Sequence, residues 1–249
     1  KYNRRKKKRY LKKNANIEKL QRRLIAEEDP KSPVSEAYRA LRTSLMYTRQ
    51  KSESHLILVS SSGPGEGKTT TIANLAITYA NLGKKTLLID SDLRKPVIHN
   101  VFKIDKTPGL TSHLSMNSDL KEIINHSNID NLDLITSGVI PPNPSELLDS
   151  KKMIQMLEIL KKEYDVILFD SPPLIAVTDA HILMKYVDQF VLVVRAGITE
   201  KGALERVMSA ITQSNKKITG VVMNAMTEEY SYGSGYYYNY YQYYYNEDD

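Results

Sequence analysis

The residues with the clearest chemistry in this sequence form a glycine-rich turn followed by a lysine and two threonines. They are Gly63, Pro64, Gly65, Glu66, Gly67, Lys68, Thr69 and Thr70. Glycines allow a sharp turn and a close approach to phosphate, and the N–H groups of such a turn at a helix start attract anions. Lys68 would reach the outer phosphates of a nucleotide, and the Thr69 hydroxyl would hold Mg²⁺. The strict pattern G-x-x-x-x-G-K-[ST] has a glycine where Ser62 stands, so we predict a deviant phosphate-binding loop rather than an ordinary glycine turn.

Carboxylates follow two apolar stretches, at residues 86–89 and 166–169. The candidate residues are Asp90, Asp92, Arg94 and Asp170. Ligands of open α/β sheets bind at the carboxyl ends of the strands, so these side chains would lie beside the phosphate loop. There the three aspartates would hold Mg²⁺ or its waters, and Asp90 or Asp92 would take a proton from an incoming hydroxyl. We include Arg94 among the candidate catalytic residues. A turn rich in Asp and Ser is the alternative.

The stretches around these residues alternate between strand and helix patterns. Strands are expected at 55–59, 86–89, 132–135, 164–170, 190–194 and 218–223, and helices at 70–81, 119–125, 145–162, 178–186 and 201–213. This alternation predicts an α/β fold of the P-loop NTPase type, with a mostly parallel central sheet and helices on both faces. Ser145 is a possible N-cap of the third helix. Asn224 follows the last strand, where it would contact a nucleotide base or serve only as a polar turn residue.

Charge is distributed unevenly along the 249 residues. The formal net charge is +6, but residues 1–13 contain nine Lys or Arg and no acid, and the rest of the chain has a net charge of −3. We therefore expect no nucleic-acid partner for the body and a basic arm over 1–29. The polybasic segment 1–13 would be solvated, bind nucleic acid or contact an anionic membrane face, and we favour the membrane over nucleic acid. The chain has no cysteine, which favours a reducing compartment. No apolar run approaches the ~20 residues of a membrane-spanning helix.

A helix is expected from Ser35 to about Gln50, and charged residues recur on it at a spacing of three. They are Glu36, Arg39 and Arg42. The residues alone favour the solvated face of an amphipathic helix, with a local Glu36–Arg39 pair.

Residues 228–249 contain ten of the 17 tyrosines and neither Lys nor Arg. The ten are Tyr230, Tyr232, Tyr236, Tyr237, Tyr238, Tyr240, Tyr241, Tyr243, Tyr244 and Tyr245. With no aliphatic residue after Met226, a packed core is not expected here. The alternatives are a disordered low-complexity tail, a stacking surface for RNA or sugar, and a cluster of phosphorylation sites, where each phosphate would add about −1.5 to −2 charges.

Taken together, these segments resemble the cytoplasmic tyrosine kinases of bacterial capsule and exopolysaccharide synthesis, the CapB-like group. The resemblance covers about 30–249. It is carried by SSGPGEGKTT at 61–70, LLIDSDLR at 87–94, VILFDSPP at 166–173 and the tyrosine cluster, together with EAYRALR at 36–42 and GVIPPNPSELL at 138–148. It implies a P-loop kinase domain at 30–227 and an autophosphorylation tail at 228–249.

The resemblance also implies roles for the residues that match. ATP and Mg²⁺ would be the cofactors, with Lys68 at the phosphates and Thr69, Asp90 and Asp170 serving the metal. Asp92, or Asp90, would orient or deprotonate the attacking tyrosine. The motif at 36–42 would mediate ring-shaped self-association through Glu36, Arg39 and Arg42, which overturns the interpretation of a merely solvated face. The tail tyrosines would be phosphorylated by a neighbouring subunit.

The implied partners are a transmembrane activator that acts in polysaccharide polymerisation, further copies of the chain, protein tyrosine substrates and a cognate phosphatase. The implied location is the cytoplasm, at the inner face of the membrane, and residues 1–29 would be an arm or an activator segment. The alternative is a nucleotide-switch ATPase of the partition or cell-division type. Those proteins carry an extra lysine early in the phosphate loop, at the position of Gly63, and the tyrosine tail also favours the kinase.

Overall fold

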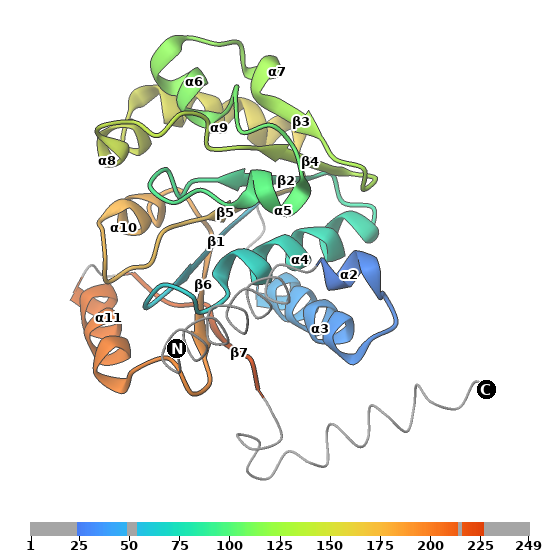
Figure 1. The fold of residues 1–249 in the computed structure, drawn as a ribbon, viewed down its shortest axis with the longest axis vertical. Coiled ribbons are helices and arrows are strands. Elements are labelled where there is room, and N and C mark those ends of the chain that lie inside the picture. The colour runs from blue at the N-terminus through green and yellow to red at the C-terminus, as the bar shows by residue number, and fades with distance from the viewer. Residues whose placement is uncertain (1–23, 49–53, 214–215, 227–249) are drawn as a thin grey trace, which may run out of the picture.

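A seven-stranded sheet forms the centre of the molecule in the computed structural model (Figure 1). The structure describes residues 24–48, 54–213 and 216–226, so the first 23 residues and the tail tyrosines lie outside it. The strands are β1 His55–Ser61, β2 Thr86–Asp90, β3 Ile124–His126, β4 Leu132–Ile135, β5 Val166–Asp170, β6 Gln189–Arg195 and β7 Gly220–Asn224. Their order is β3-β4-β2-β5-β1-β6-β7, and every neighbouring pair is parallel except β3 and β4. The predicted mostly parallel α/β sheet is confirmed.

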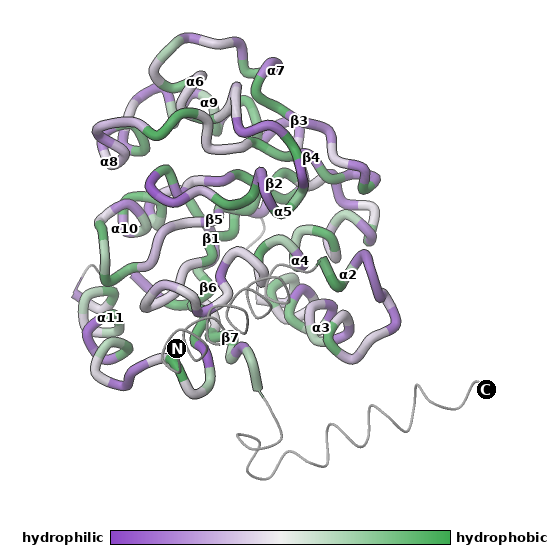
Figure 2. Tube along the Cα trace, in the orientation of Figure 1, coloured by the Kyte–Doolittle hydropathy of each residue, from purple (hydrophilic) through white to green (hydrophobic). Residues whose placement is uncertain are grey.

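Helices cover both faces of this sheet, as predicted. They are α2 Ile25–Glu28, α3 Pro33–Thr48, α4 Lys68–Asn81, α5 Ile98–Phe102, α6 Leu110–Met116, α7 Leu120–Ile123, α8 Pro144–Leu148, α9 Lys151–Glu163, α10 Asp179–Leu183 and α11 Lys201–Gln213. One core packs α2 to α5 on the first face, and the other packs α6 to α11 on the second. Successive side chains of β1 point to opposite faces and supply both cores. Ile57 and Val59 belong to the core on the first face, and Leu56 and Leu58 belong to the core on the second. Figure 2 shows the same concentration of hydrophobic residues along the strands.

Three predicted helices differ from the structure, and one of them, expected at 178–186, is only shorter, because α10 ends at Leu183. The helix expected at 145–162 is divided into α8 and α9, because the Ser150 hydroxyl accepts the Met153 N–H at 3.2 Å and caps a new helix. Ser145 is therefore not an N-cap but lies within α8. The helix expected at 119–125 ends at Ile123, and the chain continues as the short antiparallel edge strand β3.

The N-terminal part of the described chain packs on the helix that follows the glycine-rich turn. Helix α2 contacts α4, and the Ala26 N–H donates to the Asn74 side chain at 2.9 Å. Ala26 is buried. The packed structure thus begins before residue 30, while the domain boundaries themselves stay predictions.

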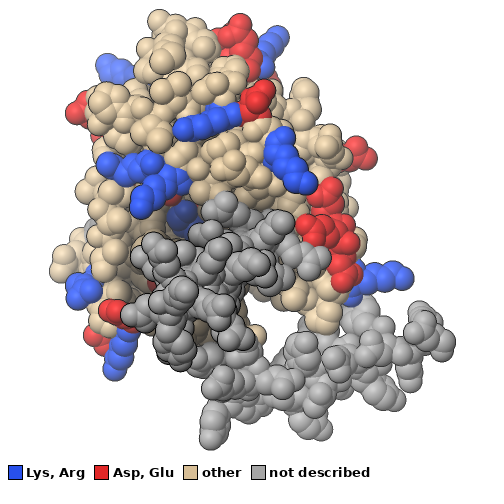
Figure 3. All heavy atoms as spheres, in the orientation of Figure 1, with Lys and Arg blue, Asp and Glu red and all other residues tan. Residues whose placement is uncertain are grey.

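Charges of both signs are spread over the surface. In the view of Figure 3, acidic atoms gather over α2, which contains Glu27 and Glu28, and Lys and Arg atoms lie around a hollow left of centre. None of the helices in the part of the chain that the structure describes is long and apolar enough to span a membrane.

Candidate active site

The carboxyl ends of β1, β2 and β5 meet at one edge of the sheet and bring the predicted acids together. Asp170 on β5 is in register with Val59 on β1 and with Asp90 on β2. Ser91 links two of these strand ends, because its N–H and its hydroxyl donate to the Asp170 carbonyl at 2.9 and 2.7 Å. The convergence expected from the sequence therefore follows from parallel pairing.

Lys68 lies at the centre of this group. Its Nζ is 3.3 Å from Asp92 Oδ2 and 3.8 Å from Asp170 Oδ1. The Thr69 hydroxyl donates to Asp170 Oδ2 at 2.6 Å. Burial by itself would lower the pKa of Lys68, but the charges of Asp170 and Asp92 outweigh it and raise that pKa above its ordinary value. The lysine is thus held as a cation, with a geometry suited to neutralising phosphate oxygens.

Asp90 and Asp170 are buried and incompletely hydrogen-bonded. Asp90 Oδ2 accepts the N–H groups of Val97 and Ile98, both at 3.0 Å. Asp90 Oδ1 and Asp170 Oδ1 accept no hydrogen bond within the described residues. Burial and the neighbouring Asp170 charge raise the pKa of Asp90 to about 8, and burial also raises the pKa of Asp170. Of these two oxygens, Asp170 Oδ1 has only the Lys68 ammonium at 3.8 Å, beyond hydrogen-bond distance, so both keep the capacity to accept a further ligand.

These residues fit a magnesium ion that is shared with a nucleotide. In the described residues, no group of three His, Cys, Asp or Glu side chains forms a complete metal site. Mg²⁺ at phosphate loops takes one or two protein ligands, phosphate oxygens and waters, so a partial set of protein ligands is what such a site requires. The Thr69 hydroxyl and the oxygens of Asp90 and Asp170 that accept no hydrogen bond supply that set.

The loop itself is closed by its own glutamate. The Glu66 carboxylate accepts the Ser62 N–H at 2.9 Å and the Ser62 hydroxyl at 2.7 Å. Ser62, which departs from the strict motif, is thus used to fasten the loop. Gly67 has a φ of 97° and precedes α4, and an added Cβ would lie 1.9 Å from the Asn224 amide nitrogen. Only glycine fits at this position, as the phosphate-binding motif requires.

Asn224 and Arg94 make contacts that the sequence did not indicate. The Asn224 side chain donates to the Glu66 carbonyl at 3.0 Å, so it lies against the phosphate loop. Arg94 forms two bonds to buried Asp179, at 2.9 and 3.1 Å, and Ser145 donates to the same carboxylate. The structure thus does not bring Arg94 into the Lys68 group, and its catalytic role stays a prediction.

The charged residues of α3 make contacts within the molecule. Arg39 Nε donates to Glu36 at 2.5 Å, which is the local pair expected from the spacing. Arg42 Nη1 donates to the Thr78 carbonyl of α4 at 2.7 Å. Their role in self-association is untested by these contacts.

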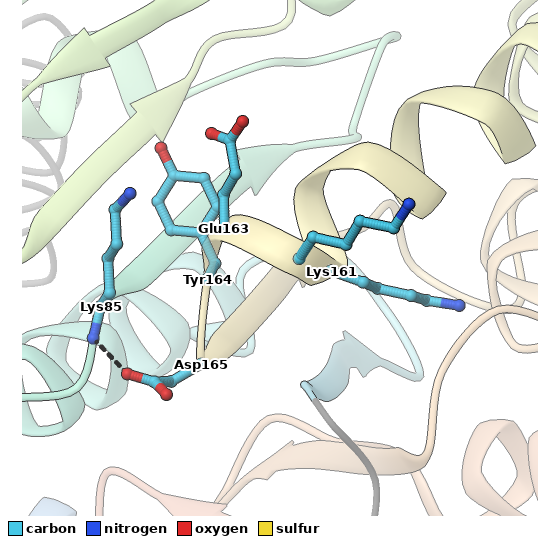
Figure 4. A pocket seen from close by; sticks show the side chains of 6 residues that line it. Lys85, Lys161, Glu163, Tyr164 and Asp165 are labelled. Carbon is cyan, nitrogen blue, oxygen red and sulfur yellow. Dashed lines mark hydrogen bonds between the residues drawn. The ribbon is translucent and has the colours of Figure 1, made fainter.

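A hollow of about 450 Å³ lies at the other end of the sheet, where β5 begins. Its lining residues are Lys85, Lys161, Lys162, Glu163, Tyr164 and Asp165. Figure 4 shows Lys85 and Lys161 pointing apart, and the Lys85 ammonium lies over the Tyr164 ring at 4.8 Å. The cations do not converge, so this hollow offers no concentrated positive charge for a phosphate.

One residue near the phosphate loop, Arg195, was not predicted from the sequence. Arg195 ends β6, and its Nη1 donates to the Gly65 carbonyl at 2.9 Å. No motif in the sequence marks it, because an arginine after a buried strand has many other uses.

Comparisons with known proteins identify the family of this chain. A family model described as an AAA domain matches residues 54–223. The chain is 44% identical over 206 residues to the tyrosine-protein kinase YwqD of Bacillus subtilis (strain 168), a match that covers 83% of this chain and 87% of YwqD. The chain belongs to the bacterial tyrosine-protein kinases. The resemblance to the CapB-like group is confirmed by the putative tyrosine-protein kinase CapB of Staphylococcus aureus, which is 35% identical over 90% of this chain and 96% of CapB.

Solved structures lead to the same family. This tyrosine kinase superposes on the chimerical protein CapA2B2 with a TM-score of 0.79 and 38% identity, over 82% of this chain and 90% of that one. The kinase domain of Escherichia coli ETK also gives 0.79, with 34% identity over 83% and 81% of the two chains. The septum site-determining protein MinD of Pyrococcus horikoshii, at 24% identity and a TM-score of 0.59, shows only that the P-loop NTPase fold is shared.

Proposed function

We propose that this tyrosine kinase uses ATP and Mg²⁺ to phosphorylate the tyrosines of its own C-terminal segment, each tail being modified by a neighbouring copy. The observation that carries the proposal is the contact of Lys68 with Asp92 and Asp170 beside the phosphate loop. The ten tyrosines at 230–245 provide the acceptor. Relatives named as kinases of polysaccharide regions, such as the putative tyrosine-protein kinase in the cps region of Klebsiella pneumoniae, support a role in regulating capsular polysaccharide synthesis or export.

In the proposed reaction, the tyrosine oxygen bonds to the γ-phosphorus while the bond from that phosphorus to the β–γ bridging oxygen breaks, and ADP leaves. Lys68 neutralises charge on the outer phosphate oxygens. Asp92 orients the tyrosine hydroxyl, and the phenol proton passes to a carboxylate or to water, since a loose transition state needs no strong base. Mg²⁺ would supply further neutralising charge to the phosphates, and Thr69, Asp90, Asp92 and Asp170 would hold it directly or through water.

The proposed location is the inner face of the membrane, reached through a transmembrane activator. The putative tyrosine-protein kinase EpsB of Ralstonia solanacearum is 36% identical over 229 residues, and the match covers only 30% of EpsB, so a kinase region of this kind occurs within longer proteins. Self-association through α3 would bring one tail to the next active site. Phosphate on several tyrosines adds about −1.5 to −2 charges each, so we expect the modified assembly to dissociate. A ring that stays intact after full modification, followed by light scattering, would contradict that expectation.

The test is incubation with ATP, Mg²⁺ and the activator segment, followed by mass spectrometry of the tail peptide. Phosphotyrosine within 230–245 in the parent, and none in Lys68→Met or Asp92→Ala, supports the kinase and its site. ATP hydrolysis with an unmodified tail would instead indicate a nucleotide switch. Mixing Lys68→Met with a chain whose ten tail tyrosines are phenylalanine tests transfer between copies, because only transfer in trans can label the Lys68→Met tail.

A further inference from the structure

Two side chains at neighbouring strand ends hold the phosphate loop from the side opposite the aspartates. Arg195 ends β6 and Asn224 ends β7, and the two are partners in the β6–β7 register. Arg195 Nη1 donates to the Gly65 carbonyl at 2.9 Å, and Asn224 Nδ2 donates to the Glu66 carbonyl at 3.0 Å. Two consecutive carbonyls of the loop are thus fastened to one edge of the sheet.

Fastening a carbonyl also orients the next N–H group. A trans peptide is planar, and its C=O and N–H bonds point in opposite directions. When Arg195 draws the Gly65 carbonyl outward, the N–H of Glu66 turns toward the concave side of the loop. Asn224 does the same for the N–H of Gly67. Such inward N–H groups are the ones with which a phosphate loop binds anions.

The arginine is itself well anchored. Its backbone N–H donates to the Thr199 hydroxyl at 2.8 Å, and its carbonyl accepts the Thr199 N–H at 2.9 Å. The next residue, Ala196, donates its N–H to the Asn224 carbonyl at 3.0 Å. The turn after β6 is therefore joined to the end of β7, and the guanidinium extends from a fixed base to the exposed tip of the loop.

We propose that Arg195 is a positioning residue for the phosphates of ATP. It holds the Gly65–Glu66 peptide in the orientation that binds phosphate, and its permanent positive charge lies beside the loop that receives the anion. It acts through the loop backbone and not on the reacting atoms. The inference rests on the proposed function, since the nucleotide phosphates are the ligand that the loop is oriented to bind.

The experiment compares Arg195→Met, which keeps an apolar stem and removes the donors, with Arg195→Lys, which keeps one charged donor. Arg206→Met, at an exposed position of α11, is the matched control. Calorimetric titration of the full chain measures the affinity for ADP, pyrophosphate and adenosine. We expect Arg195→Met to weaken ADP and pyrophosphate binding about five- to tenfold, the size of one lost charged hydrogen bond. Arg195→Lys should regain part of this loss, and adenosine, which has no phosphate, should bind all three variants as it binds the parent.

A kinetic measurement separates positioning from a general structural role. With the tail as acceptor, the KM for ATP should rise about five- to tenfold in Arg195→Met, while kcat changes less than twofold. Unchanged ADP and pyrophosphate affinity in a folded Arg195→Met chain would overturn the inference. So would an equal loss for adenosine, or no recovery in Arg195→Lys. A parent chain that binds neither ADP nor pyrophosphate would remove the proposed function instead, which keeps the two failures distinct.

Discussion

Replacing Glu66 by alanine should loosen the phosphate loop, because it removes a closure built from the loop's own side chain. Glu66 is 4% exposed, and its carboxylate accepts two hydrogen bonds from Ser62, which is 0% exposed. Alanine would leave the Ser62 N–H and hydroxyl without an acceptor, and each unsatisfied buried group costs about 1–3 kcal/mol. Water can reach part of the loop at Gly65, which is exposed. We therefore expect a total loss of about 3 kcal/mol, or a fall in Tm of about 6–12 °C for a chain of this size.

Thermal unfolding followed by circular dichroism without nucleotide measures this loss. Glu66→Gln is the matched control, because its amide can still pair with both groups of Ser62 and should lose much less. In a Ser62→Gly background, which restores the strict motif, Glu66→Ala should cost about half as much, since only the N–H remains to be satisfied. Equal Tm values for Glu66→Ala and Glu66→Gln would refute the argument that the carboxylate closes the loop.

Three further predictions concern the surroundings of the site. In chemical denaturation, Arg94→Ala should destabilise the protein more than Asp179→Ala. Arg94→Ala leaves the fully buried Asp179 carboxylate without its cation, whereas in Asp179→Ala the half-exposed arginine can turn to water. A larger loss of stability in Asp179→Ala would contradict this reasoning. Without metal, the free energy of unfolding should fall as pH rises above the ordinary pKa of an aspartate, and it should level off above about 8. The reason is that the folded state holds the Asp90 proton more tightly than the unfolded chain does. Asp90→Asn should flatten this dependence when Tm is measured as a function of pH. Arg42→Ala should lower Tm by about 2–4 °C through the lost bond to the Thr78 carbonyl, about 1 kcal/mol, and an unchanged Tm would show that this bond contributes nothing.

The sequence was sufficient for the parts of the site that depend on neighbours along the chain. Lys68 and Thr69 are placed by the turn that precedes them, and Asp90 and Asp170 by the ends of their own apolar strands. Their meeting required one further assumption, that these strands are parallel, and the alternation of strands with helices justified it. For these residues, the local sequence pattern was enough to predict their positions in the fold.

Contacts between distant segments could not be predicted in the same way. Arg94 and Asp179 are 85 positions apart, and Arg195 and Gly65 are 130 apart. A charged residue after a strand has several possible partners, and only the sheet order selects among them. The missed strand β3 has a similar cause, since three residues with a single apolar side chain give no alternation, and its pairing with β4 decides its structure.

The phosphate loop is thus held by contacts of two kinds, with different consequences for catalysis. Lys68 and Thr69, on the side of β2 and β5, touch carboxylates that a bound cation or substrate would engage, so those contacts must rearrange when the site is loaded. Arg195 and Asn224, on the side of β6 and β7, donate side-chain hydrogen bonds to loop carbonyls, which a nucleotide does not need. The second set can therefore persist through the reaction. A loop fixed on one side can exchange partners on the other without losing the orientation of its N–H groups, which is what repeated binding of ATP and release of ADP require.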